Sequence, residues 1–122
     1  MKYLTILFAA ALIIFSCTAA RTASMNNVHV NIKEIVKNPE TTLVDVRIPE
    51  QFAEKTAANA VNIPLATIKD NIDFFKKQKN IVVFCNSGKQ AAEAIDILKQ
   101  NGVLNVYSAK TLKNVEAIQN EK

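Results

Sequence analysis

The sequence contains little cysteine, histidine and glycine and no tryptophan, and these shortages narrow what the chain can be. Among its 122 residues are two cysteines, two glycines and one histidine. Two cysteines are too few for a scaffold built on disulfides, and His29 has no cluster of further ligands with which to hold a metal ion. The length suffices for one domain with its own hydrophobic core and leaves no room for a second. We therefore expect a single domain without metal or cofactor, with His29 as a surface residue.

The excess of positive over negative charge is also modest. The chain has 15 basic and 11 acidic residues, a formal net charge of +4. The basic residues are scattered apart from Lys76, Lys77 and Lys79, and no aromatic residues are interleaved with that cluster. Single-stranded nucleic acid is bound by basic grooves that also carry aromatic rings for base stacking. The cluster is instead typical of the solvated end of a helix, and we expect no nucleic-acid partner.

The only long apolar run lies near the start of the chain. A lysine precedes residues 4–15, which are apolar almost throughout. This is the length of a signal peptide and too short to cross a bilayer comfortably. The run ends in a small residue and Cys17, which resembles the lipobox of bacterial lipoproteins and implies cleavage before Cys17 and acylation of its thiol. We predict a lipoprotein-type signal peptide over residues 1–16 and a flexible tether over 17–27, so that the chain is anchored in the bacterial cell envelope and faces the periplasm.

Two alternatives remain for this region. Cleavage near residues 18–20 would give a soluble periplasmic protein, and an uncleaved apolar run would remain as an anchor. A disulfide between Cys17 and Cys85 is not expected, because a bridge is normally anchored in structure at both ends and Cys17 lies in the predicted tether.

From residue 28 onward, strand-like and helix-like patterns alternate. Strands are predicted at 28–30, 42–46, 60–63, 81–84 and 106–107. Helices are predicted from Ile32 to near Asn38-Pro39, from Pro49, at 65–75, from the loop after Cys85 to about Asn101 with Gly102 as its left-handed cap, and at 111–119. This order predicts an α/β domain over residues 28–122 with a mostly parallel sheet and helices on both faces. Ligands bind such sheets at the carboxyl ends of the strands.

Cys85 lies at one of these strand ends. Residues 81–84 are β-branched or aromatic, as in a strand buried on both faces, and residues 91–98 have helical spacing. Backbone N–H groups of the loop and of the first helical turn lack helical acceptors and converge on an anion placed there. Gly88 stands where a tightly curled loop needs a residue without a Cβ. We predict that Cys85 is a nucleophile that acts as its thiolate; the alternative is an inert buried cysteine.

The neighbouring polar residues have supporting roles in this interpretation. Asn86 and Ser87 are expected to shape the loop through bonds from side chain to backbone, and Lys89 places a positive charge beside it. Asp45 and Arg47 follow a buried strand at its carboxyl end. A charge pair there more often fixes the following loop than takes part in chemistry, and a catalytic role is the alternative.

Three motifs resemble the rhodanese family: residues 43–52, residues 60–65 and the loop from Cys85 to Gln90. The similarity covers about residues 28–118 and is greatest to small exported rhodaneses of the phage-shock protein E type, whose loop reads Cys-Asn-small-Gly-basic-Gln. The resemblance implies a single rhodanese-like domain.

The same resemblance implies a thiosulfate sulfurtransferase. In it, Cys85 would carry the transferred sulfur as a persulfide, and Asn86, Ser87, Gly88, Lys89 and Gln90 would form the loop that binds substrate. The donor would be thiosulfate or a similar small molecule, and the acceptor a thiol or cyanide. No cofactor is implied, and we expect a monomer whose only contact with a membrane is the lipid anchor.

Several positions depart from the wider family. Gln90 replaces a common arginine, Lys55-Thr56 replaces Gly-His, and Asn59 replaces a glycine but tolerates a left-handed backbone. Lys110-Thr111 replaces a Gly-Gly pair that shapes the rim of the pocket. Because lysine is a point charge and not a bidentate fork, Lys89 should recognise anions more loosely than an arginine would.

Two other functions stay open. A phosphatase or arsenate reductase of the related fold has a loop one residue longer that ends in arginine, and Ala91 stands at that position here. A catalytically degenerate rhodanese would instead bind a partner or sense redox state in the envelope, with Cys85 as the sensor thiol.

Overall fold

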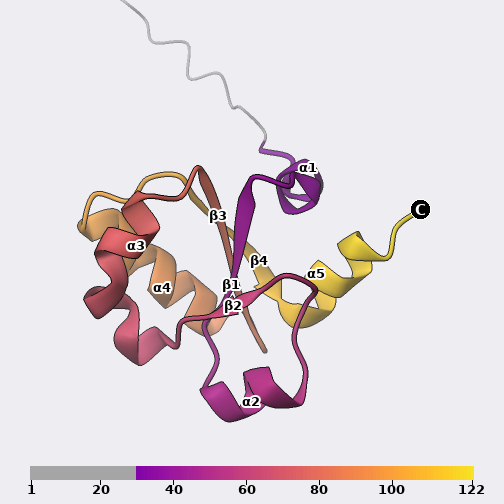
Figure 1. Ribbon diagram of the computed structural model, residues 1–122, viewed down its shortest axis with the longest axis horizontal. Coiled ribbons are helices and arrows are strands. Elements are labelled where there is room, and N and C mark those ends of the chain that lie inside the picture. Colours follow the sequence, from indigo (N-terminus) through magenta and orange to yellow (C-terminus); the bar gives the residue numbers. More distant parts are fainter. Residues whose placement is uncertain (1–29) are drawn as a thin grey trace, which may run out of the picture.

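The computed structural model describes residues 30–122 (Figure 1). The elements are α1 (Ile32–Lys37), β1 (Thr41–Asp45), α2 (Pro49–Glu54), β2 (Val61–Asn62), the 3-10 helix η1 (Leu65–Asn71), α3 (Ile72–Lys76), β3 (Asn80–Cys85), α4 (Lys89–Gln100), β4 (Val106–Thr111) and α5 (Leu112–Gln119). The predicted signal peptide and tether, with Cys17 and His29, lie outside the described residues. Residues 28 and 29 of the strand predicted at 28–30 also lie outside the described residues. Its third residue, Val30, is described and belongs to no strand. Across residues 30–122, no helix combines the length and the apolar character needed to span a membrane.

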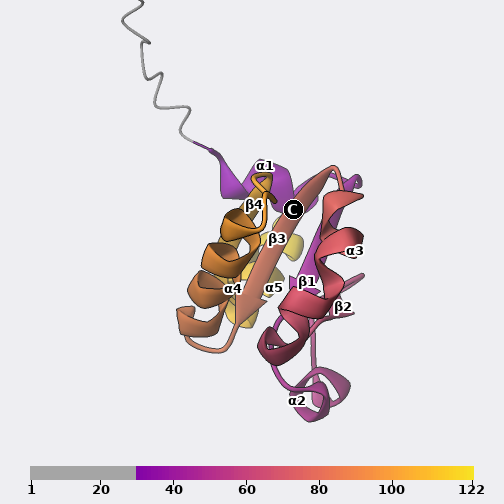
Figure 2. The ribbon, with the colours of Figure 1, turned by 90° about the vertical axis from the view of Figure 1, so that its left-hand side faces the viewer.

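The strands form one sheet in the order β2-β1-β3-β4, with every neighbouring pair parallel. Helices α3 and α4 cover one face, which Figure 2 shows from the front, and α1 and α5 cover the other (Figure 1). This confirms the predicted α/β fold. The carboxyl ends of β1 and β3 meet at one edge of the sheet, because these two strands pair in register up to Asp45 and Phe84.

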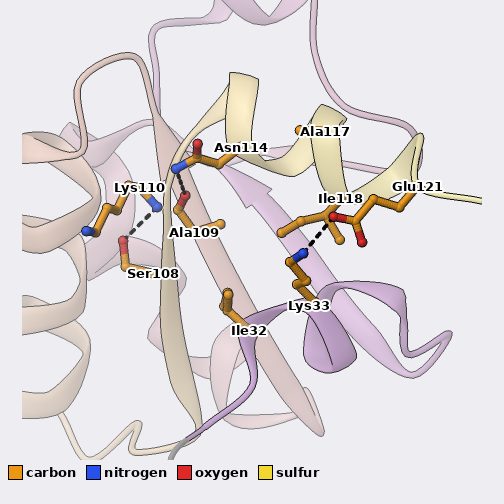
Figure 3. Close-up of a pocket in the computed structure, with 9 residues that line it drawn as sticks. All are labelled: Ile32, Lys33, Ser108, Ala109, Lys110, Asn114, Ala117, Ile118 and Glu121. Atoms are coloured by element: carbon orange, nitrogen blue, oxygen red, sulfur yellow. Dashed lines mark hydrogen bonds and ion pairs between the residues drawn. The ribbon is translucent and has the colours of Figure 1, made fainter.

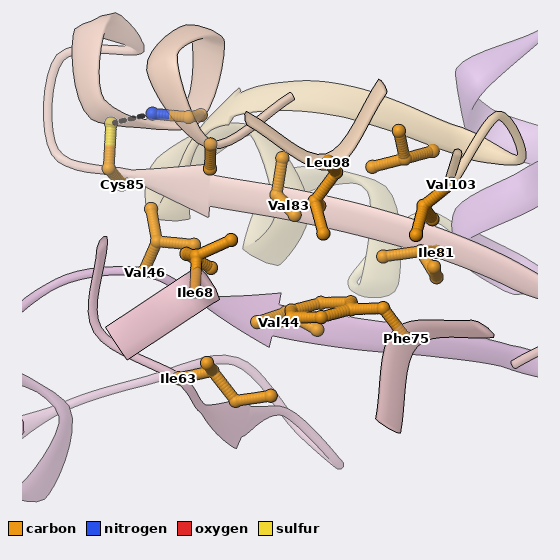
Figure 4. Close-up of a cluster of buried hydrophobic side chains, with 13 residues drawn as sticks. Val44, Val46, Ile63, Ile68, Phe75, Ile81, Val83, Cys85, Leu98 and Val103 are labelled. Carbon is orange, nitrogen blue, oxygen red and sulfur yellow. Dashed lines mark hydrogen bonds between the residues drawn. The ribbon is translucent and has the colours of Figure 1, made fainter. Parts of the chain in front are cut away.

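The side chains of β3 explain why its sequence is apolar without alternation. Ile81, Val83 and Cys85 belong to the core beneath α3 and α4, and Val82 and Phe84 to the core beneath α1 and α5. All five are at most 1% exposed, because helices cover both faces of the sheet. Cys85 therefore ends the strand with its side chain on the α4 face, at the edge of the core shown in Figure 4.

The end of α4 has the predicted glycine cap. Gly102 has a φ of +84°. Its N–H donates to Lys99 O at 3.1 Å, and the N–H of Val103 donates to Leu98 O at 2.9 Å. These two bonds form a Schellman motif, and the apolar contact that accompanies it is supplied by Val103 and Leu98, which share one core cluster.

The helix predicted over residues 65–75 is in fact two helices. A 3-10 turn comes first because Pro64 O accepts both the N–H and the hydroxyl of Thr67, at 2.8 and 3.0 Å. Leu65 and Ile68 are three residues apart, a spacing that places side chains on one face of a 3-10 helix as well as of an α-helix. The apolar pattern therefore did not distinguish the two forms.

Strand β4 is longer than the two residues predicted. It runs to Thr111 because its polar second half continues to pair with β3, where Phe84 lies opposite Lys110 and Cys85 opposite Thr111. The register shifts at this point: Val83 faces Ser108, so one extra residue of β4 is accommodated before Lys110. This irregularity brings Lys110 beside the cysteine.

Candidate active site

The Cys85 sulfur lies among backbone donors at the start of α4. Its Sγ accepts the N–H of Gly88 at 3.0 Å. It also accepts the N–H of Ala91 at 3.4 Å, the dashed line at Cys85 in Figure 4. Both groups belong to the N-terminal turn of the helix, where N–H groups have no acceptor inside the helix. Together with the positive end of the helix dipole, they favour a negative charge on the sulfur.

A third contact favours the protonated thiol instead. Lys110 O lies 3.6 Å from Sγ, where it accepts a bond from the S–H group. Cys85 is only 1% exposed, so the sulfur is shielded from bulk water. The site thus offers two backbone N–H donors to a thiolate and one carbonyl acceptor to a thiol. It lies at the edge of an apolar core.

The loop of residues 86–88 takes its shape from Gly88, whose φ is +92°. A Cβ at this position would lie 3.3 Å from the Cβ of Lys110, so both the backbone conformation and the close approach of β4 favour glycine. The predicted loop-shaping bond of Ser87 is present, because its Oγ accepts the N–H of Lys89 at 3.4 Å. Lys89 and Gln90 are exposed at the first turn of α4.

Asn86 departs from its prediction. Its side-chain oxygen accepts a bond from Arg47 Nη1 at 3.2 Å, a contact between side chains and not a bond to the local backbone. Arg47 is 39 positions away in the sequence, and no local pattern signals this contact.

Asp45 and Arg47 form a buried ion pair. Asp45 is 0% exposed and Arg47 6%. Arg47 Nε lies 3.0 Å from Asp45 Oδ1 and Nη2 lies 2.7 Å from Oδ2, a bidentate arrangement. The hydrogen bond with Asp45 is the main reason that the pKa of Arg47 is raised above its ordinary value, against the opposing effect of burial.

The remaining bonds of this pair connect two loops. Arg47 Nη2 donates to Lys55 O at 2.5 Å, and the Thr56 hydroxyl donates to Asp45 Oδ2 at 2.9 Å. With the bond to Asn86, the pair joins the segment after α2 to the loop that carries Cys85. This is the arrangement expected of residues that position a loop.

Two hollows on the described part of the molecule bear on where a ligand could bind. One is lined by Lys55, Asn86, Leu112, Lys113 and Glu116 and so borders the cysteine loop. The larger, of about 360 Å³, lies between α1, β4 and α5 (Figure 3). No residue of the loop from Cys85 to Gln90 lines it, so its size does not make it the site around Cys85.

Residues 29–111, most of the chain, match the protein-family model of the rhodanese-like domain. The chain belongs to the rhodanese-like domain family. This confirms the resemblance carried by the three sequence motifs.

Relatives and solved structures agree with this assignment. The thiosulfate sulfurtransferase PspE of Escherichia coli (strain K12) is 38% identical over 74 residues, which cover 59% of this chain and 71% of that protein. The thiosulfate sulfurtransferase GlpE of Coxiella burnetii (strain RSA 493 / Nine Mile phase I) is 28% identical over 80 residues, covering 66% and 75%. A structure described as a rhodanese with anions from E. coli aligns with a TM-score of 0.56 at 37% identity, covering 61% of this chain and 89% of that one.

This rhodanese domain has left-handed backbone at two of its departures from the family pattern. Among residues 30–122, Asn59 and Lys110 are the non-glycine residues with positive φ, at 63° and 67°. The expectation that Asn59 tolerates this conformation is confirmed. Lys110 belongs to the pair that replaces Gly-Gly at the predicted rim of the pocket, and the structure adds that its backbone is left-handed, a conformation that costs a residue with a side chain about 1 to 2 kcal/mol and that glycine adopts freely.

Proposed function

We propose that the chain is an exported single-domain sulfurtransferase that moves sulfane sulfur from thiosulfate or a similar donor to a thiophilic acceptor through a persulfide on Cys85. As a rhodanese, it is an enzyme of the thiosulfate sulfurtransferase type, and this coarser assignment rests on the family match and on relatives with that activity. The single observation that carries the finer proposal is the position of Cys85 Sγ at the end of β3, where it accepts N–H bonds from Gly88 and Ala91.

The proposed reaction has two steps. The Cys85 thiolate attacks the outer sulfur of thiosulfate, the S–S bond of the donor breaks, and sulfite leaves with the electron pair. The cysteine then carries one added sulfur, and the N–H donors that favour the thiolate also stabilise the negative terminal sulfur of the persulfide. A thiol or cyanide takes this sulfur, and Cys85 leaves as the thiolate. Neither step needs a general base, which suits a chain with one histidine.

We assign the remaining loop residues to substrate binding. Lys89 is exposed beside the nucleophile and supplies positive charge for an anionic donor. The E. coli structure with 37% identity is described as a rhodanese with anions, which supports an anionic donor for this chain. Asp45 and Arg47 act as positioning residues in this proposal, because the bonds of their ion pair hold the segments on either side of the loop.

Incubation of the wild-type protein with thiosulfate is expected to add the mass of one sulfur atom to Cys85, and cyanide or a small thiol is expected to remove it. The physical reason is that the N–H donors of the loop stabilise both the Cys85 thiolate and the longer persulfide anion. Intact-mass spectrometry measures the change, with the Cys85→Ser protein as the control that gains no sulfur. If thiosulfate leaves no mass change while peroxide readily oxidises Cys85, the redox-sensing alternative accounts for the protein better.

The export part of the proposal rests on the sequence alone. We propose that residues 1–16 are removed as a signal peptide, that Cys17 is acylated, and that residues 17–27 tether the domain to the membrane.

Mass spectrometry of the protein purified from bacterial membranes is expected to show a chain that begins at Cys17 and carries lipid, because acylation requires that thiol. Cys17→Ala is expected to carry no lipid, and Ser24→Ala, a change within the same tether, to be lipidated as the wild type is. A wild-type chain that is unmodified and wholly in the soluble envelope fraction would favour cleavage near residues 18–20.

A further inference from the structure

The left-handed backbone at Lys110 lies directly beside the cysteine loop. We propose that Lys110 determines donor specificity, by holding an ammonium group at the mouth of the loop that favours donors with two negative charges over donors with one. This inference rests on the proposed function, since it names the class of donor that the Cys85 site prefers.

Backbone contacts place Lys110 at the site. Its carbonyl oxygen is 3.6 Å from Cys85 Sγ, and its Cβ and Cγ lie 3.3 and 3.8 Å from the position that a Cβ on Gly88 would occupy. The base of the lysine side chain therefore packs over the one loop residue that has no side chain. The four-carbon stem of lysine therefore starts beside the loop that carries the sulfur.

The unusual conformation directs this side chain. In a regular strand, successive side chains alternate between the faces of the sheet. Here the register shift before Lys110 and its φ of +67° interrupt that alternation. Figure 3 shows the side chain leaving β4 on the side of α4, away from Ile32 and Ile118. The N–H of Lys110 donates to Ser108 Oγ at 3.0 Å, which helps to hold the turn.

The charge of Lys110 is available to a ligand. Within residues 30–122, the ion pairs include Lys55 with Glu116 at 3.3 Å but none that involves Lys89 or Lys110. Gln90, next in the loop, is neutral. Glycine would adopt the backbone conformation of residue 110 without strain, whereas lysine adopts it at a cost in stability. A function of the lysine charge, which glycine lacks, would account for a lysine at this position.

Two donors with the same reacting S–S bond test the proposal. Thiosulfate carries two negative charges and methanethiosulfonate carries one, and cyanide serves as the acceptor for both. For Lys110→Asn, which removes the charge but tolerates the left-handed backbone, the ratio of kcat/KM for thiosulfate to that for methanethiosulfonate is expected to fall about fivefold, mainly through KM. The fall is expected to shrink in high salt, because exposed charges are screened.

Three further variants separate the effect of the Lys110 charge from the effect of the backbone conformation at residue 110. Lys110→Arg keeps the charge and should keep the ratio. Lys110→Gly should lower the ratio as the asparagine does, and it should raise the melting temperature because the backbone strain is relieved. Lys99→Asn removes an exposed lysine from the last turn of α4, at the opposite end from the loop, and should leave the ratio unchanged.

The outcomes distinguish this inference from the function on which it rests. If the wild type uses both donors but Lys110→Asn and Lys110→Gly leave the ratio unchanged, or Lys99→Asn lowers it equally, the specificity role of Lys110 is overturned and the sulfurtransferase stands. If the wild type transfers sulfur from neither donor, the proposed function fails, and the inference fails with it.

Discussion

Cys85→Ser is expected to abolish sulfur transfer from thiosulfate to cyanide while the domain remains folded. A serine oxygen cannot hold a persulfide, and no other cysteine is present among residues 30–122. The side chains are nearly isosteric, and the N–H groups of Gly88 and Ala91 that now reach Sγ offer hydrogen bonds to the new hydroxyl. The fold should therefore tolerate the change.

Thiosulfate-to-cyanide turnover, measured beside the circular dichroism spectrum and the melting temperature, checks this expectation. Ser87→Ala is a control in the same loop, because it removes a hydroxyl whose bond to the N–H of Lys89 is long at 3.4 Å and leaves the sulfur of Cys85 in place. It should still turn over thiosulfate, in contrast to Cys85→Ser. Turnover by a folded Cys85→Ser protein at the wild-type rate would contradict the persulfide mechanism.

Arg47→Met is expected to destabilise the domain by about 3 to 5 kcal/mol, because it leaves the Asp45 carboxylate buried without its partner. The stability of a domain of this size is about 5 to 15 kcal/mol, so the loss is a large fraction of the whole. The bond to Asn86 disappears as well, and we expect the cysteine loop to lose activity even under conditions where the variant is folded.

Urea denaturation gives the free energy of unfolding for this comparison. Lys79→Met is the control, because it breaks an ion pair with Glu40 whose side chains are 66% and 58% exposed, and such pairs contribute at most about 1 kcal/mol. Asp45→Asn combined with Arg47→Met removes both charges and should recover part of the loss. An Arg47→Met protein as stable as Lys79→Met would show that the pair does not organise this edge of the sheet.

The sequence by itself determined the features that depend on neighbouring residues. The unbroken apolar run before Cys85 could be interpreted as a strand covered on both faces, since the lack of alternation follows from burial on both sides. Gly88 and Gly102 have positive φ where a loop and a helix end need it, and Pro49 begins α2. The place of Cys85 between strand and helix followed from these local signals.

Only the tertiary structure decided how distant segments meet at the sulfur. Arg47 reaches Asn86 because β1 and β3 pair in register. No sequence pattern within either segment indicates that pairing. The polar half of β4 is a strand because it bonds to β3, and Lys110 takes a left-handed backbone because the register shifts there. Local propensity cannot predict such a residue, since its conformation is unfavourable alone and is stabilised only by the packing of β4 against the loop that carries Cys85.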